Sequence, residues 1–140
     1  TEFARPQAQT FRGTCLNTDF SAGVSQLIRS SGPALRTTLY STLLAVFFVL
    51  LGRYSGQSDL LLGTPVAGRA QLCFERVVGH FVNMLCLRCV MPAGPSTFHS
   101  LASEVQHQVI ECLSHADLPF AHLVEHLQTH RDPSRSSLFQ

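Results

Sequence analysis

The sequence carries little charge and no excess of either sign. Only 14% of its 140 residues are charged, and the formal net charge is +1 with the seven histidines neutral. A surface that binds nucleic acid carries clustered Lys and Arg, so we expect no nucleic-acid partner. The apolar fraction of 45% is too high for a disordered chain, and the length suits one domain with a modest core.

The sequence also lacks an apolar run long enough to cross a bilayer. Its longest run extends from Leu39 to Leu51 and is interrupted by Ser41 and Thr42, whereas a spanning helix needs about 20 apolar residues. We interpret this run as a helix buried on most sides. The chain begins at Thr1 without a recognisable signal peptide, so we expect no membrane partner and a cytoplasmic location.

Cysteine is too sparse and too irregular for a disulfide framework. The five cysteines are Cys15, Cys73, Cys86, Cys89 and Cys112. Cys86 and Cys89 have the C-x-x-C spacing of redox and zinc sites, but no second such pair follows. Residues 81–90 resemble a buried strand, and cysteine often behaves as a small buried hydrophobe. We therefore interpret the pair as structural.

One stretch, HLVEH at 122–126, matches a zinc-peptidase pattern. His122, Glu125 and His126 fit H-x-x-E-H, which makes a zinc hydrolase one hypothesis. On a helix, however, the spacing i, i+3, i+4, i+7 predicts a buried apolar stripe, formed by Phe120, Leu123, Val124 and Leu127. The three polar residues then face the rim or solvent, so we favour a packing helix without a metal.

The hydrophobic pattern predicts strands that alternate with helices. In the first half of the chain we expect a strand within 11–20, a helix from Ser21 to about 31 broken by 31–33, and a long helix opened by Thr37 or Thr38 that ends near 55–56. A strand at 60–62 followed by a loop at 63–68 comes next, and then a strand in the second half of 77–90. The last two elements are a helix capped by Ser96 that buries Phe98, Leu101, Val105, Val109 and Leu113, and a helix opened by Pro119 and ended by 131–133. This alternation predicts an α/β fold, a sheet with helices packed on it.

Four stretches resemble motifs of condensation domains from nonribosomal peptide synthetases. Residues 79–88, GHFVNMLCLR, resemble GxFVNTxxxR, and HADLPF at 115–120 followed by LVE at 123–125 is similar to HQDxPFExLVE. RDPSR at 131–135 with LFQ at 138–140 resembles RDxSRNPLFQ. RYSGQ at 53–57 and GTPVAGR at 63–69 resemble the upstream stretch RYSGQxD…GTPxxGR. The four lie in family order over nearly the whole chain, with Met84 and Ala116 among the departures.

The resemblance implies a fold and a reaction. Condensation domains have two lobes, each resembling chloramphenicol acetyltransferase, with a tunnel between them. Donor and acceptor arrive on phosphopantetheine arms of carrier proteins, and the acceptor amine attacks the donor thioester to form an amide. Residues 1–140 then form a partial domain, the start of the second, acceptor-side lobe, a mixed sheet with helices and with both ends truncated. The implied partners are the rest of the condensation domain and the carrier and adenylation domains, and the isolated piece is expected to self-associate.

The resemblance also assigns roles to residues. It places Thr64, Gly68, Gly79, Phe81, Val82 and Asn83 at the substrate tunnel. The Asn83 amide can hold the substrate amide or satisfy nearby backbone, and both interpretations stay open. The structural motif positions are Asp117, Pro119, Phe120, Arg131, Asp132 and Arg135, where an Asp–Arg pair is expected to lock the exit of the last helix.

The catalytic motif of the family, HHxxxDG, belongs to the first lobe. This chain has no adjacent histidine pair, so we expect no catalytic residue in it, no cofactor bound directly, and no activity of the piece alone. Two other hypotheses remain: a non-catalytic module, degenerate or recruiting a partner protein, and an acyltransferase acting on free substrates.

Overall fold

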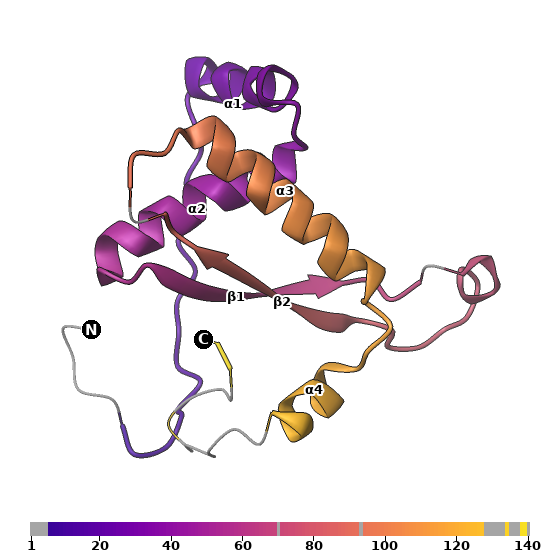
Figure 1. Cartoon of the computed structure of the whole chain (residues 1–140). Coiled ribbons are helices and arrows are strands. Elements are labelled where there is room, and N and C mark those ends of the chain that lie inside the picture. Colours follow the sequence, from indigo (N-terminus) through magenta and orange to yellow (C-terminus); the bar gives the residue numbers. More distant parts are fainter. Residues whose placement is uncertain (1–5, 70, 93, 128–133, 135–137, 140) are drawn as a thin grey trace.

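The structure is a two-stranded antiparallel sheet with helices packed against it (Figure 1). The computed structural model describes residues 6–69, 71–92, 94–127, 134 and 138–139. Its elements are α1 (Ala22–Leu35), α2 (Leu39–Ser55), β1 (Asp59–Val66), the short 3-10 helix η1 (Leu72–Phe74), β2 (Asn83–Val90), α3 (Phe98–Ser114) and α4 (Phe120–His126). Helices α2 and α3 lie on one side of the sheet, and α4 lies near the opposite side. The predicted α/β fold class is confirmed.

Hydroxyl caps start the first two helices where the sequence predicts them. The Ser21 hydroxyl accepts the N–H of Val24 at 3.4 Å, and the Thr38 hydroxyl accepts the N–H of Ser41 at 3.1 Å. A side chain at this position satisfies an N–H that lacks a partner within the helix. The third cap differs from the prediction, because Thr97 rather than Ser96 accepts the N–H of Ser100.

The predicted break of α1 at 31–33 is wrong. The helix continues through Pro33 to Leu35. Its last turn is held by N–H groups of the following residues: Arg36, in the left-handed region at φ 55°, donates to the Pro33 carbonyl, and Thr37 donates to the Gly32 carbonyl. These bonds satisfy carbonyl groups of the last turn and close the helix two residues after the proline.

The strand predicted within 11–20 is also wrong. These residues form neither helix nor strand, and their side chains are exposed. A strand needs a neighbouring sheet edge to accept and donate its backbone hydrogen bonds. Among the described residues, both strands of the sheet come from later parts of the chain, β1 and β2.

Strand β1 is longer than predicted, because residues 63–66 belong to the strand and not to a loop. The register runs from Asp59 opposite Val90 to Val66 opposite Asn83. Glycine and proline usually disfavour strands, but Gly63 has a packing role here. A methyl group at this position would overlap the ring of Phe139, which lies against the strand.

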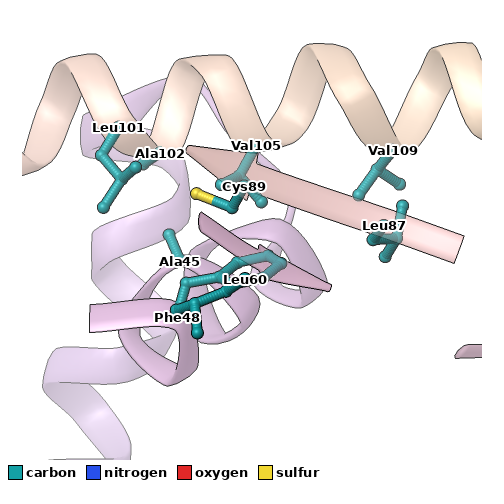
Figure 2. Packing of buried hydrophobic residues seen from close by; sticks show 9 residues of the cluster. All are labelled: Ala45, Phe48, Leu60, Leu87, Cys89, Leu101, Ala102, Val105 and Val109. Atoms are coloured by element: carbon teal, nitrogen blue, oxygen red, sulfur yellow. The ribbon is translucent and has the colours of Figure 1, made fainter. Parts of the chain in front are cut away.

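The core forms on one face of the sheet, beneath α2 and α3 (Figure 2). Leu60, Leu87 and Cys89 of the strands meet residues of the two helices. The helical members are Ala45 and Phe48 from α2 and Leu101, Ala102, Val105 and Val109 from α3. The predicted stripe of α3 is therefore confirmed in its centre, whereas Phe98 and Leu113 at its ends are 39% and 50% exposed.

Helix α2 is buried on one face only, contrary to the prediction of burial on most sides. Its buried residues are Ser41, Thr42, Ala45 and Phe48. The opposite face is apolar and 41–49% exposed at Leu43, Val46, Phe47 and Leu50. Helices α1 and α3 contact α2, and among the described residues this apolar face stays largely exposed. In the described part of the chain no single helix is long and apolar enough to cross a membrane, and α1 with α2 meets that test only as a pair bent by 104°.

Cys86 and Cys89 lie on opposite faces of β2. Side chains alternate along a strand, so residues three apart point to different sides, and the burial pattern agrees: Cys89 is 1% exposed in the core, whereas Cys86 is partly buried. Two thiols on opposite faces cannot share a disulfide or a metal ion. The structural interpretation of this C-x-x-C pair therefore holds.

This placement predicts unequal thiol reactivity. Burial raises the pKa of the Cys89 thiol, with smaller contributions from Glu104 and Asp59, so little thiolate forms there and reagent access requires local opening. Cys73 is exposed. We expect a maleimide to label Cys73 roughly 100-fold faster than Cys89 in the folded protein. Peptide mass spectrometry measures the two labelling rates. Equal rates in the folded protein, without urea, would contradict the placement of Cys89 in the core.

Candidate functional site

The two predicted tunnel stretches meet at one end of the sheet. In the register, Val66 at the end of β1 lies opposite Asn83 at the start of β2. The chain on either side of this pair therefore runs close together, which brings Gly68 against Phe81. Residues that lie far apart in two separate motifs form one contiguous surface here.

Gly68 is needed for this close approach. Its φ of +60° lies in the left-handed region that side chains disfavour, and a Cβ atom would collide with the carbonyl oxygen of Phe81. Gly68 thus permits a close passage between two segments of backbone. The neighbour that requires it is the main chain of the second tunnel stretch.

The Arg69 side chain forms hydrogen bonds with the loop that joins the two stretches. Its Nη1 donates to the carbonyl oxygens of Phe74 and of Val77, the latter at 2.9 Å, and its Nη2 donates to that of Gly79 at 3.2 Å. Its guanidinium carbon lies 4.2 Å from the centre of the Phe81 ring. The sequence predicts no separate role for Arg69, which stands at the end of the stretch GTPVAGR.

Asn83 binds backbone with both ends of its amide. Its Nδ2 donates to the carbonyls of Ala116 at 2.9 Å and Leu118 at 2.7 Å, and its Oδ1 accepts the N–H of Phe120 at 3.0 Å. Both amide hydrogens are thus used within the chain. This geometry favours the backbone interpretation of Asn83 over direct contact with a substrate amide.

Three of the predicted structural positions lie near the hydrogen bonds of Asn83. Pro119 precedes α4, and its carbonyl accepts the N–H groups of His122 and Leu123. Phe120 packs its ring against that of Phe139 with centroids 5.4 Å apart. Asp117 is exposed in the turn between α3 and α4. The predicted partners Arg131, Asp132 and Arg135, and the expected helix end at 131–133, lie outside the described residues.

Thr64 lies at the rim of a cavity. The Tyr40 hydroxyl donates to the Thr64 hydroxyl at 2.9 Å, joining the start of α2 to β1. Beside this pair is a cavity of about 230 Å³ with mainly apolar walls. It is lined by Tyr40, Thr64, Pro65, Val66, Leu85, Leu87, Val109 and Leu113. Of the remaining predicted tunnel residues, Gly79 is exposed and Val82 is 49% exposed.

Arg88, the last residue of the stretch GHFVNMLCLR, forms an ion pair away from the predicted tunnel residues. It forms a two-pronged ion pair with Asp59, with Nε–Oδ1 at 2.9 Å and Nη2–Oδ2 at 2.7 Å. The hydrogen bond to Arg88 lowers the pKa of Asp59. Both side chains are more than half exposed and lie at the far end of the sheet from Asn83. Exposed pairs of this kind contribute little to stability.

The zinc pattern on α4 does not come together as a cluster. His122, Glu125 and His126 are exposed, and within the described residues no group of three His, Cys, Asp or Glu side chains is arranged to hold a metal. The predicted apolar stripe is only partly buried. Phe120, Leu123 and Val124 are partly covered, and Leu127 is 53% exposed. A seven-residue helix that packs on the end of β2 offers too little surface to bury a full two-turn stripe.

Comparison with known proteins decides the family. Residues 1–140 match the family model described as Condensation domain. The chain belongs to the condensation-domain family. The resemblance predicted from the four motifs is therefore confirmed.

Similar proteins show the setting of this condensation-domain chain. It is 41% identical over 141 residues to gramicidin S synthase 2 of Brevibacillus brevis, covering 99% of this chain and 3% of that protein. It superposes with a TM-score of 0.96 and 30% identity on holo-AB3403, a four-domain nonribosomal peptide synthetase bound to AMP and glycine, covering 99% of this chain and 10% of the other. It also matches the complex of the X-domain and OxyB from teicoplanin biosynthesis, with a TM-score of 0.89, 26% identity, and coverage of 99% and 30%.

Proposed function

We propose that this chain is the opening part of the second, acceptor-side lobe of a condensation domain that joins two carrier-bound aminoacyl or peptidyl thioesters by an amide bond. The observation that carries the proposal is the meeting of residues 64–68 with residues 79–83 at one end of the sheet. Both stretches resemble condensation motifs, and they adjoin β1 and β2, whose residues contribute to the core.

The chemistry separates positioning from catalysis. Attack by an amine on a thioester needs a neutral amine, close approach of the two groups and stabilisation of the developing oxyanion. The sequence has no HHxxxDG motif and no adjacent histidines. We infer that the catalytic histidine comes from the other lobe, that this lobe shapes the acceptor side, and that these 140 residues alone form no amide bond.

The exposed apolar face of α2 supports a larger assembly. Among the described residues, Leu43, Val46, Phe47 and Leu50 on one face of α2 are partly exposed apolar side chains, and an exposed apolar patch often marks a contact with a partner. We infer that the rest of the condensation domain covers it. The substrates then arrive on phosphopantetheine arms of carrier proteins loaded by adenylation domains, and no cofactor is held by this lobe itself. The isolated piece is expected to associate, which light scattering over a concentration series measures.

The test is a condensation assay on the synthetase module that contains this chain. With donor and acceptor carrier proteins each loaded and checked by mass spectrometry, we expect the intact module to transfer the donor to the acceptor amine. Replacing the histidines of the HHxxxDG motif in the other lobe should abolish transfer, while loading of the carrier proteins continues. Full loading of both carriers without any amide product from the intact module would overturn the proposal.

A second candidate is a non-catalytic module that recruits a partner protein. The observation that favours it is the structural match to the X-domain of teicoplanin biosynthesis, which is seen in complex with OxyB. The match is 26% identical, below the 41% to gramicidin S synthase 2, so we place it second. The same assay separates the two, because a recruiting module binds its partner and forms no amide.

A further inference from the structure

The connection between β1 and β2 is long for two antiparallel neighbours. It runs from the end of β1 at Val66 to the start of β2 at Asn83, whereas most hairpins use two to five residues. Among its described residues, none belongs to the core cluster, and the short helix η1 is the one regular element. Its course therefore depends on contacts made within the loop itself.

Arg69 makes three of these contacts with one side chain. Three carbonyls from successive points of the loop, those of Phe74, Val77 and Gly79, converge on its guanidinium. A guanidinium suits this role because its planar fork presents several N–H groups in fixed directions. Each bond is charge-assisted, which makes it stronger than a bond between neutral groups.

The same cation fixes the aromatic ring that follows. The guanidinium lies over Phe81 at 4.2 Å, and the Phe81 ring packs against the Phe74 ring with centroids 5.3 Å apart. On its other side the Phe81 carbonyl touches Gly68, the residue before Arg69. One short stretch, Gly68 and Arg69, thus holds the main chain and side chain of Phe81 from two sides.

We propose that Arg69 is a positioning residue for the acceptor substrate, an inference that rests on the proposed function of this lobe. By holding the loop at Gly79 and Phe81, it sets where residues 79–82 lie at the tunnel. The sheet register and the core do not depend on it, because β1 and β2 pair with each other and pack on α2 and α3. Loss of Arg69 should therefore weaken acceptor binding more than it weakens the fold.

The test compares three variants in the intact synthetase module. Arg69→Ala is expected to raise KM for the loaded acceptor carrier about tenfold, with kcat changed less than about twofold and KM for the donor carrier unchanged. Arg69→Lys should fall between Ala and wild type, because an ammonium cannot reach three carbonyls in fork geometry. Arg76→Ala is the matched control: Arg76 lies exposed on the same loop, and its removal should leave both KM values unchanged.

Hydrogen exchange gives the readout that does not depend on activity. In Arg69→Ala, amides of residues 71–82 should exchange faster, while those of β2 and α3 keep their protection. An unchanged acceptor KM in Arg69→Ala, or an equal rise of both KM values with faster exchange throughout the lobe, would overturn the positioning role. Absence of amide formation by the wild-type module overturns the proposed function instead, and the acceptor role falls with it.

Discussion

Gly68→Ala is expected to lower the free energy of unfolding of the condensation domain by about 2–5 kcal/mol. Two costs add at this position. An alanine must adopt the left-handed conformation at φ +60°, and its Cβ meets the Phe81 carbonyl oxygen. That atom belongs to backbone, which is held by the start of β2 and by Arg69, so it cannot move aside as the end of a flexible side chain would. Urea unfolding followed by circular dichroism measures the loss.

Gly56→Ala is the matched control for this experiment. Gly56 ends α2 with a similar φ of +70°, but nothing lies within 4 Å of the position its Cβ would occupy. Its replacement therefore carries the conformational cost alone, about 1–2 kcal/mol. The difference between the two variants isolates the collision with Phe81. Equal losses would show that the main chain at Phe81 moves freely, against the close contact described above.

Asn83→Ala is expected to cost roughly 2–4 kcal/mol, because three hydrogen bonds to the turn before α4 are lost, each worth about 1 kcal/mol, and partly buried groups lose their partner. The three bonds join β2 to the carbonyls of Ala116 and Leu118 and to the N–H of Phe120. Gln108→Ala serves as control, since that side chain makes an exposed bond to Glu104 and should cost less than about 0.5 kcal/mol.

Asn83→Asp sharpens the test through its pH dependence. A carboxylate still accepts the Phe120 N–H, but its second oxygen faces two carbonyl oxygens where Nδ2 donated. That contact disfavours the charged form, so the folded-state pKa of the new carboxyl lies above its ordinary value. A raised folded pKa means that stability falls as pH rises through the interval between the unfolded and folded values. We expect the variant to be less stable than Asn83→Ala at pH 7 and to recover toward pH 4.

The same variants decide between the two interpretations of Asn83. If the side chain bound substrate rather than backbone, Asn83→Ala would leave unfolding unchanged and raise KM, and Asn83→Asp would show no pH-dependent loss of stability. Melting curves at several pH values, with the wild type measured in parallel, distinguish these outcomes before any substrate is needed.

Local chemistry in the sequence was enough to predict several parts of the fold. The caps Ser21 and Thr38, and the buried positions Leu101, Val105 and Val109, follow from hydroxyl placement and helical spacing, which depend only on near neighbours. The failures have a common cause. The helix that contains Pro33 is closed by bonds from residues after it, and residues 63–66 are in a strand because they pair with residues 83–86 of β2. Both depend on partners outside the local pattern.

The sequence motifs predicted which segments form the candidate site, 64–68 and 79–83, but not which atoms contact each other. The pairing register of β1 and β2 brings the two segments together. The hydrogen-bond partners of Asn83 and Arg69 could not be predicted, since they are main-chain groups, mostly carbonyls, whose positions depend on the completed fold. A carbonyl carries no residue identity, so no spacing of side-chain types in the sequence points to it.

The ring of Phe139 has a consequence for the order in which this lobe forms. Phe139 lies against Gly63 of β1 and the ring of Phe120, so it brings a residue near the end of the chain onto the first strand. Contacts between distant parts of a chain form slowly, because a large loop must close before they do. During synthesis β1 leaves the ribosome well before Phe139 is added, so packing of its core face on α2 can begin earlier than the aromatic contact at Gly63.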